Sequence, residues 1–484
     1  MTKLKLFFST CLYLIIIVAL TSCGNFDEST SSPSSSQSAV IGVTTDNYPT
    51  SFIDGLIAQF NASANNALAG TAAKYAVNQY NLTYNTLDSN GNPTIASAKL
   101  LVPSYNQNVD IVLYLNYATK TLDSSAGTNT YVDFTNYDGI DTSTIATNIG
   151  SDTESLLNTI LASQGIAVVM PDHLGFGASA GLHPYIVGTG YAYQSIDALR
   201  AAKNYADSSI TTFTFSDKFI ITGYSGGGYA TLATHKELVT NPSNYTDLNL
   251  STNLKGVVPG APPANLSTVM AGQLLSVSDY PRPDYGPYIL LGYNDTYNLV
   301  SDVKTLFKEE YQSVVDDFYS GTKSLSGDIL PQFSSIISDN TLYPIDIFTD
   351  SFKLEITQAY ADYNSDYNLG SPTTTGFFEK IIENDAYNYD PGTTNVFFLH
   401  LNADTIVPIE NSESAAYSMQ LYGNASSFNP STGAGNIAII DPVLYANPAT
   451  RALSYTNGTF TDHSTGLVYY HLIMQGLAAS WFAQ

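Results

Sequence analysis

The sequence predicts an α/β fold, with a mostly parallel central sheet flanked by helices and a large, mainly helical insertion. Continuous apolar runs alternate with helical segments along the chain, as in sheets that are buried on both faces. One of these runs leads directly into a glycine-rich turn and a second helical segment, which places a serine at the end of a strand. The alternation stops over residues 262–394 and then resumes, so the sheet is predicted to form from residues 41–261 and 395–484.

The first residues predict an exported lipoprotein. Lys3 and Lys5 precede an apolar run, Leu12–Leu20, which ends in Leu20-Thr21-Ser22-Cys23. This segment resembles a bacterial lipoprotein signal, in which the cysteine is lipidated and becomes the first residue of the mature chain. The apolar run is too short for a comfortable transmembrane helix. Residues 1–23 are therefore predicted to be a signal peptide ending at lipidated Cys23, and an ordinary secretory signal or an uncleaved anchor is the alternative.

Residues 24–40 predict a flexible tether. Seven serines lie between Ser29 and Ser38, and the segment offers almost nothing to bury. By analogy with lipoprotein sorting, Gly24 lacks the aspartate that favours retention in the inner membrane. The expected location is the bacterial cell envelope, with the protein anchored by lipid at Cys23 in the outer membrane or at the cell surface.

The net charge argues against nucleic acid and anionic lipid headgroups as partners, and the cysteine content argues against a disulfide. The chain has 42 acidic and 17 basic residues and a formal net charge of -25. Nucleic acid is not expected as a partner, because neutralising phosphates needs clustered Lys and Arg, and direct binding to anionic lipid headgroups is disfavoured for the same reason. The only cysteines are Cys11 and Cys23, and the first would leave with the signal while the second would be acylated. No disulfide is therefore expected in the mature domain.

The core elements are predicted in chain order from their patterns. Residues 74–103 read as a hairpin, because Tyr80, Leu82 and Tyr84 alternate with polar residues, Asp88-Ser89-Asn90-Gly91 forms a turn, and Ile95–Val102 returns. Helices are predicted at 151–165, 195–205 and 465–482. Six apolar runs are predicted to be strands of the parallel sheet, namely Ile111–Tyr117, Ile166–Met170, Phe219–Thr222, Leu254–Val258, Val396–Leu401 and Ile437–Ile440.

The interval 262–394 contains helical stretches at 300–319 and 352–363 but no clear strand. About 130 residues inside a compact domain must have structure of their own. We expect a cap inserted between two core strands, which covers the active site and moves to admit substrate. The alternative is an independent second domain with its own ligand.

The turn Gly223-Tyr224-Ser225-Gly226-Gly227 predicts a nucleophile elbow. It follows the run Phe219–Thr222 and precedes a helical stretch, the context in which a sharp turn exposes a serine. Small residues at 223 and 227 let strand and helix approach closely. Ser225 is predicted to be the nucleophile and Gly226 N–H an oxyanion donor. A glycine-rich turn without chemistry is the alternative.

A second match to the same pattern serves as an internal control. Gly177-Ala178-Ser179-Ala180-Gly181 follows a run that ends too early, at Met170, and Pro184 prevents a helix from starting where an elbow needs one. Ser179 is therefore predicted to be a loop serine.

The general base is sought among six histidines. In α/β-hydrolases the partners follow the serine in the order acid, then histidine. His173 and His183 precede Ser225, His235 lies on the helix after it, and His400 lies inside a strand, so His463 and His471 remain. His463 lies in a polar run at the start of the final helix and is the predicted base. His471 lies two turns into that helix and is the alternative.

The acid is predicted to be Asp404, which directly follows the strand that ends at Leu401. A carboxylate just past a buried strand is well placed to accept the imidazole proton. Asp441, after the next strand, is the alternative. Asp462 is adjacent to the histidine in sequence and is predicted to be a solvated loop residue.

Several motifs, taken together, resemble the secretory lipase family of the fungal lipase A type and its bacterial lipoprotein relatives. The likeness extends in order and spacing over residues 70–484, including the insertion. The motifs are Pro171-Asp172-His173-Leu174-Gly175-Phe176-Gly177, Gly223-Tyr224-Ser225-Gly226-Gly227-Gly228, Gly260-Ala261-Pro262-Pro263, Asn402-Ala403-Asp404-Thr405-Ile406-Val407-Pro408 and Asp462-His463.

The resemblance implies an α/β-hydrolase fold that acts on carboxylic esters, with Ser225, Asp404 and His463 as the triad and Gly226 as one oxyanion donor. Many α/β-hydrolases have His-Gly after the third strand, whereas this chain has Leu115-Asn116-Tyr117-Ala118-Thr119. The second oxyanion N–H is expected from that loop, near Ala118. Fungal members commonly have disulfides and no lipid anchor, so the choice of substrate stays open.

The sequence therefore predicts a serine esterase or lipase that cleaves small-molecule or lipid esters through an acyl-enzyme. No metal or cofactor is expected, because no His, Cys or Asp cluster has the spacing of a ligand set. Two alternatives stay open. The same triad could serve a serine peptidase or amidase, and the scaffold could be a non-catalytic surface binding protein.

Overall fold

The computed structural model describes residues 39–63, 68, 70–104, 108–116, 119–121, 126, 128, 151–210, 214–278, 280–339, 341–367, 376–401, 404–421, 437–440 and 463–482. All of these belong to one compact unit, Pro33–Gln484. The predicted signal peptide, the lipidation site Cys23 and nearly all of the predicted tether lie outside the described residues. Among the helices that are described, none has both the length and the hydropathy to cross a membrane.

The described residues form a core sheet of nine strands in the order β1-β2-β3-β5-β4-β6-β7-β8-β9. The pairs β1–β2, β2–β3 and β3–β5 are antiparallel. The pairs β5–β4, β4–β6, β6–β7, β7–β8 and β8–β9 are parallel. The strands are β1 (Val40–Tyr48), β2 (Val77–Leu87), β3 (Pro93–Pro103), β4 (Asn108–Leu115), β5 (Ala167–Pro171), β6 (Thr214–Tyr224), β7 (Leu254–Gly260), β8 (Phe398–Leu401) and β9 (Ile437–Ile440).

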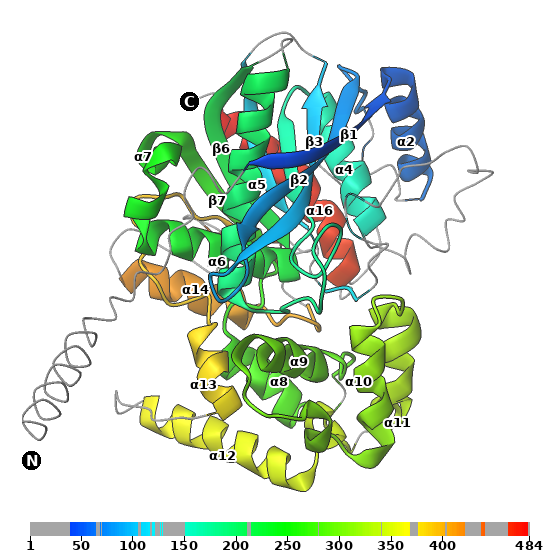
Figure 1. Ribbon diagram of the computed structural model, residues 1–484, viewed down its shortest axis with the longest axis vertical. Coiled ribbons are helices and arrows are strands. Elements are labelled where there is room, and N and C mark those ends of the chain that lie inside the picture. The colour runs from blue at the N-terminus through cyan, green and yellow to red at the C-terminus, as the bar shows by residue number, and fades with distance from the viewer. Residues whose placement is uncertain are drawn as a thin grey trace, which may run out of the picture. The chain divides into compact units, whose positions relative to one another are not determined.

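Both faces of the sheet are covered by helices (Figure 1). Strand β4 shows how, because Ile111, Leu113 and Leu115 belong to one buried cluster and Val112 and Tyr114 to the other. The first cluster includes side chains of α5 (Gly188–Ser209) and α6 (Gly226–Thr240), and the second includes side chains of α2 (Thr50–Ser63), α4 (Ser151–Ser163) and α16 (His463–Phe482). Burial on both faces explains why the strands are continuous apolar runs in the sequence.

The predicted hairpin and the six predicted parallel strands are confirmed, with ends that differ by a few residues. The helix predicted at 195–205 begins at Gly188. Two glycines in its first turn are poor helix formers and hid this start, but Gly188 N–H is held by the Asn384 side chain at 2.8 Å. The last helix begins at His463 rather than at 465.

The described helices between β7 and β8 fall within the range predicted to be the cap, and they lie at one end of the sheet in Figure 1. They are η3 (Leu266–Met270), α8 (Ala271–Ser276), α9 (Tyr285–Tyr297), η4 (Val303–Leu306), η5 (Glu309–Tyr311), α10 (Gln312–Tyr319), η6 (Leu325–Ile329), η7 (Leu330–Phe333), α11 (Ser334–Ser338), η8 (Pro344–Ile347), α12 (Asp350–Tyr367) and α13 (Gly376–Glu383). The other helices in the described part of the chain are η2 (Pro242–Leu248), α7 (Leu250–Asn253) and α14 (Glu410–Leu421).

The helical stretch predicted at 300–319 is present as three separate segments, η4, η5 and α10, rather than as one continuous helix. Asp302 caps a short turn by accepting the Lys304 N–H, and Phe307 then pairs as an isolated β-bridge with Phe348. A residue that pairs in this way cannot also continue a helix, so only α10 is regular. The helix predicted at 352–363 is confirmed as the longer α12.

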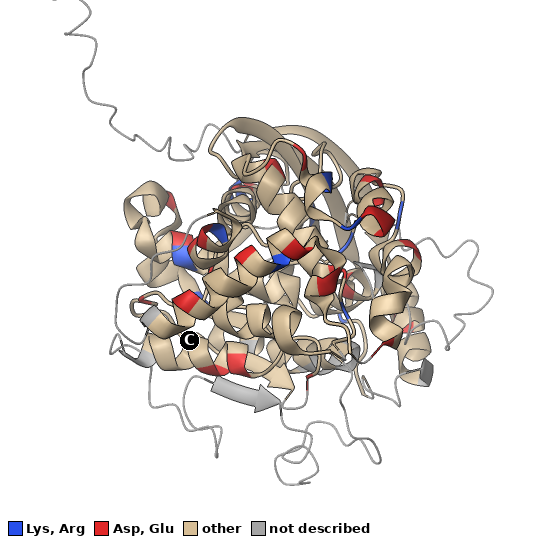
Figure 2. Ribbon diagram, turned by 90° about the horizontal axis from the view of Figure 1, so that it is seen from below, with Lys and Arg blue, Asp and Glu red and all other residues tan. Residues whose placement is uncertain are grey.

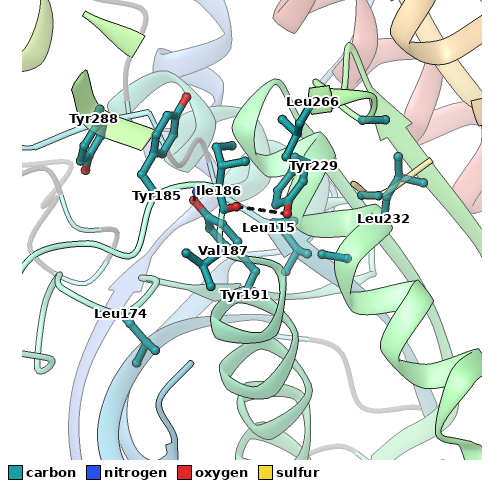
Figure 3. Close-up of a cluster of buried hydrophobic side chains, with 14 of the residues drawn as sticks. Leu115, Leu174, Tyr185, Ile186, Val187, Tyr191, Tyr229, Leu232, Leu266 and Tyr288 are labelled. Carbon is teal, nitrogen blue, oxygen red and sulfur yellow. Dashed lines mark hydrogen bonds between the residues drawn. The ribbon is translucent and has the colours of Figure 1, made fainter. Parts of the chain in front are cut away.

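A buried cluster joins the elbow helix α6 to the loop that precedes α5 (Figure 3). Tyr229, on the second turn of α6, donates its hydroxyl proton toward the Ile186 carbonyl at 3.2 Å and the Asn384 carbonyl at 2.7 Å. Tyr185 stacks on Tyr288 of α9 with ring centroids 4.3 Å apart. Aromatic side chains therefore tie the core sheet and the inserted helices together next to the turn that carries Ser225.

Candidate active site

Ser225 occupies a sharp strand-to-helix turn between β6 and α6. Its backbone has φ 58° and ψ −121°, a conformation that residues with a side chain rarely adopt. Two hydrogen bonds hold the turn, since Ser225 N–H donates to the Gly260 carbonyl at 2.8 Å and Tyr229 N–H donates to the Ser225 carbonyl at 3.0 Å. The predicted elbow therefore has the strained geometry that places a serine hydroxyl at the end of a strand.

The glycines of the turn are required by close packing. A Cβ on Gly223 would lie 2.5 Å from both the Leu115 and the Gly227 carbonyl oxygens, and a Cβ on Gly227 would collide with the Leu115 carbonyl oxygen. Neither position has room for a side chain without a shift of the backbone. The prediction that small residues let strand and helix approach here is confirmed.

The structure brings Ser225, His463 and Asp404 together. His463 Nε2 lies 2.8 Å from Ser225 Oγ, and His463 Nδ1 lies 2.5 Å from Asp404 Oδ2. A carboxylate can only accept, so Nδ1 carries the proton and Nε2 is free to accept one from the serine. The three residues are 3%, 8% and 7% exposed in the order serine, histidine, acid, so the network is shielded from water.

A side chain of β6 also positions the histidine. Tyr224, the last residue of β6, donates its hydroxyl proton to the His463 carbonyl at 2.8 Å, and its ring lies 5.0 Å from the imidazole. The residue before the serine therefore fixes the first residue of α16. This contact was not predicted, although the large aromatic residue inside the G-x-S-x-G pattern was visible in the sequence.

Asp404 is held as an ionised acceptor. Burial alone would raise the pKa of its carboxyl, but the neighbouring His463 and its hydrogen bond, His400 and the Val407 N–H together hold that pKa below its usual value. Oδ1 accepts the backbone N–H groups of Ile406 and Val407, both at 2.9 Å, while Oδ2 faces His463. The carboxylate is charged at neutral pH and oriented for the imidazole.

Gly226 is the first residue of α6 and is buried. The N–H groups in the first turn of a helix have no acceptor within the helix, so they can serve a developing negative charge. Ala118 lies outside the described residues. Asn116, two positions before it, is fixed by its side chain on the Pro171 carbonyl at 2.8 Å and by its own carbonyl oxygen, which lies 2.9 Å from His173 Nε2.

The alternatives considered from the sequence lie elsewhere or are not described. Ser179 lies in a loop, as predicted, and its hydroxyl accepts the Gly175 N–H at 3.1 Å. His471 is fully buried in α16, where Nδ1 lies 3.0 Å from the Leu467 carbonyl oxygen. Asp441 and Asp462 lie outside the described residues.

His400 is a neighbour of the site that sequence reasoning did not use. Its place inside a strand argued against a role as the base, yet its Nε2 lies 3.7 Å from Asp404 Oδ2. A spacing of four residues across the end of a strand was the available signal. No group of three or more His, Cys, Asp or Glu side chains in the described part of the chain is arranged to hold a metal ion.

Comparisons with known proteins give a family match and a shared fold. Residues 139–282, which include the elbow, match the family described as secretory lipase. No curated protein matches the chain. The resemblance to secretory lipases predicted from the motifs is confirmed by the family match, which supports a carboxylic ester hydrolase.

Solved structures share the fold. The rice cell wall degrading esterase LipA from Xanthomonas oryzae superposes with a TM-score of 0.60 and 22% identity, over 91% of this chain and 96% of that one. A protein from Legionella pneumophila gives 0.64 and 20%, over 92% and 98%. Candida antarctica lipase A gives 0.52 and 17%, over 84% and 76%. The predicted α/β-hydrolase fold is therefore confirmed.

Proposed function

We propose that this α/β-hydrolase, which is similar to the secretory lipases around its elbow, is a serine carboxylic-ester hydrolase with Ser225, His463 and Asp404 as its catalytic triad. The observation that supports it most is the pair of hydrogen bonds made by His463, at 2.8 Å to Ser225 Oγ and 2.5 Å to Asp404 Oδ2. A serine hydroxyl becomes a nucleophile when a base can take its proton and an acid orients that base.

Acylation follows from these positions. His463 Nε2 takes the proton of Ser225 as Oγ attacks the ester carbonyl carbon, and Asp404 stabilises the imidazolium that forms. The carbonyl oxygen becomes an oxyanion, for which Gly226 N–H is the proposed donor together with an N–H from the loop near Ala118. The intermediate then collapses, and the departing alkoxide takes the proton from His463. The product is an alcohol and an ester between the acyl group and Ser225.

Deacylation repeats the same steps with water. His463 removes a proton from a water molecule as its oxygen attacks the acyl carbon, and the second tetrahedral intermediate releases Ser225 with the proton returned to Oγ. The net reaction converts one ester and one water into an acid and an alcohol. No step needs a metal or a redox cofactor.

The cavity among the inserted helices favours a substrate with an apolar acyl group. The inserted helices line a partly open cavity of about 80 Å³, separate from the triad residues, whose lining is almost wholly apolar, with side chains such as Leu274, Ile289, Phe348, Phe352 and Phe377. Burying one methylene group in such surroundings stabilises binding by about 0.8 kcal/mol. A lipid ester therefore suits the insertion better than a charged or peptide substrate, although the alternative of a serine peptidase uses the same triad.

Replacing the nucleophile tests the proposal. Ser225→Ala is expected to lower kcat on p-nitrophenyl acyl esters by about 10⁴-fold or more, because both the nucleophile and the acyl-enzyme are lost. Ser179→Ala is the matched control, since it removes the serine of the other G-x-S-x-G pattern and should leave turnover unchanged. Ester turnover by Ser225→Ala at more than a few per cent of the wild-type rate would refute the assignment.

Two further measurements separate the alternatives. A fluorophosphonate probe is expected to label the wild type and Ser179→Ala but not Ser225→Ala, whereas a non-catalytic binding protein would show no labelling at all. Preference for aminoacyl or prolyl amides over p-nitrophenyl esters would favour the peptidase.

A lipid anchor at Cys23 is part of the same proposal and is supported by the signal-like residues before it. Two or three acyl chains hold a protein on a membrane far more firmly than one. Cys23→Ser is expected to abolish incorporation of labelled palmitate and to move the protein out of the membrane fraction, with turnover of a soluble ester unchanged. Cys11→Ser is the control, because Cys11 lies inside the signal. Membrane association that survives Cys23→Ser would rule out this anchor.

A further inference from the structure

We propose that His400 is a positioning residue, which ties the turn that carries Asp404 to strand β8 and so fixes the carboxylate for His463. The inference rests on the proposed triad and extends it to a residue that does not touch substrate. Its basis is the set of contacts that the buried imidazole of His400 makes on both of its nitrogens.

His400 is fully buried in β8, and each ring nitrogen has a hydrogen-bond partner. Nδ1 lies 2.7 Å from Ser412 Oγ, at the start of α14, and Nε2 lies 2.8 Å from the Val407 carbonyl oxygen. Both partners come from the segment that follows Asp404. The ring therefore bridges the strand before the acid and the chain after it.

These partners determine the tautomer. A carbonyl oxygen can only accept, so Nε2 carries the proton and donates it to Val407, and Nδ1 accepts the Ser412 hydroxyl proton. Burial lowers the pKa of His400, against the opposing influence of Asp404 and of the Val407 hydrogen bond. The titratable groups that act on the ring are Asp404, His463 and Glu410. The imidazole is neutral at the pH at which an esterase works, with every polar atom satisfied.

His400 acts on Asp404 through Val407, which is hydrogen-bonded to both. Val407 N–H donates to Asp404 Oδ1 at 2.9 Å, and Val407 C=O accepts from His400 at 2.8 Å. The same residue is thus held by the acid on one side and by the histidine on the other. If the Val407 carbonyl lost its donor, the N–H groups that orient the carboxylate would no longer be fixed relative to β8.

The His400 N–H also lies near the charge itself. Nε2 is 3.7 Å from Asp404 Oδ2, which is too long for a hydrogen bond but close enough for the positive end of the N–H dipole to stabilise the carboxylate. That same oxygen accepts from His463 at 2.5 Å. Two imidazoles therefore face one carboxylate oxygen, and only one of them can reach the serine.

If His400 only filled space, the position of its hydrogen-bond donor would not matter for activity. Two variants that place a donor at different positions therefore test the proposal. In His400→Gln the side-chain amide reaches roughly the position of Nε2 and can donate to Val407. In His400→Asn the shorter amide reaches only the position of Nδ1, so it can pair with Ser412 but not with Val407. The two variants are matched in polarity and differ by one methylene group.

We expect H400Q to keep kcat within about threefold of the wild type and H400N to lose about 10- to 100-fold, because small displacements of catalytic groups cost rates of this size. KM should stay within about twofold in both. In H400N the acid limb of the kcat/KM profile should move to lower pH, because the imidazolium form of His463 loses part of the stabilisation from Asp404. Rates are divided by the fraction of protein that a fluorophosphonate titrates, which corrects them for any protein that is not folded.

Equal kcat values and equal pH profiles for H400N and H400Q would overturn the proposal. Should both variants fail to fold, Ser412→Ala keeps the imidazole and removes the hydroxyl that donates to its Nδ1. It is expected to move the acid limb in the same direction with a loss of about threefold to tenfold in kcat, and an unchanged profile would also overturn the proposal. Failure of the triad itself would appear differently, as wild-type protein whose Ser225 the fluorophosphonate does not label.

Discussion

At the scale of single residues, the site depends on an unfavourable backbone conformation at Ser225 that neighbouring contacts enforce. A non-glycine residue with the φ and ψ of Ser225 costs about 1–3 kcal/mol, so the surrounding contacts must enforce it. The Gly260 carbonyl holds the serine N–H, and the Leu115 carbonyl lies directly against Gly227. Leu115 ends β4 just before the loop on which the second oxyanion donor was predicted. The glycine thus governs the spacing between the elbow and that loop.

Gly227→Ala is therefore expected to lower both stability and activity. Its Cβ would collide with backbone atoms of β4, which cannot rotate away as a side chain could. Overpacking of this kind lowers the free energy of unfolding by about 1–3 kcal/mol. The displaced elbow should also lower kcat by about 10-fold or more in the molecules that stay folded. Urea unfolding and titrated ester turnover measure the two effects.

Gly55→Ala is the matched control, because Gly55 lies in α2 and nothing is within 4 Å of the position that its Cβ would take. An added methyl group there should raise helix stability by up to about 1 kcal/mol and leave turnover unchanged. If both variants behaved alike, close packing at Gly227 would not be the reason for a glycine.

At the scale of elements, the two ends of the inserted helices are fastened to each other. Asp385, which follows α13, accepts the N–H groups of Leu266 and Ser267 at 2.7 and 3.0 Å and the Ser267 hydroxyl at 2.5 Å. Ala386 N–H donates to the Ala264 carbonyl at 2.9 Å, and Lys236 of α6 donates to the Asp385 carbonyl at 2.8 Å. The insertion thus leaves and rejoins the core at one place, beside the elbow helix.

This junction should be sensitive to pH. Burial raises the pKa of Asp385 to about 7, against the hydrogen bonds that favour its charged form. In the unfolded chain the carboxyl loses its proton near pH 4. Between about pH 4 and 7 the folded state therefore holds one proton more than the unfolded state, and stability falls as pH rises through this window. Above it the contribution is constant.

Asp385→Asn should remove that dependence. The amide oxygen can still accept the Leu266 and Ser267 N–H groups, and no charge has to be buried at high pH. The melting temperature of the variant minus that of the wild type is expected to rise from pH 4 to 7 and then to level off. A difference that stays constant over this range would show that Asp385 ionises as freely in the folded protein as in the unfolded chain.

At the scale of the whole molecule, negative charge predominates over the described helices, as Figure 2 shows from below with many Asp and Glu and few Lys and Arg. A formal net charge of -25 keeps the protein soluble but repels anionic lipid headgroups. If the protein works at a membrane, its surface charge does not bind it to that membrane. This is consistent with the proposed anchor at Cys23, which would supply attachment independently of surface charge.

The sequence predicted strands β2 to β9 and pointed to the three proposed site residues because each is marked by a local pattern. Strands β4 to β7 are buried on both faces and so are continuous apolar runs, and the order serine, acid, histidine follows from the fold. It did not predict α2 or strand β1, whose residues are mostly half-buried or exposed in the structure. The role of His400 could not be predicted either, because its hydrogen-bond partners Val407 and Ser412 are set by tertiary packing rather than by periodicity.

The hydrogen bond between His463 and Ser225 joins residues that are 238 positions apart in the chain. A ribosome that has made the nucleophile must still make the whole inserted segment, then Asp404, and finally His463. Until that point the serine hydroxyl has no base and is chemically ordinary. In the proposed mechanism the growing polypeptide therefore cannot hydrolyse esters until His463 has been made and has folded against Ser225.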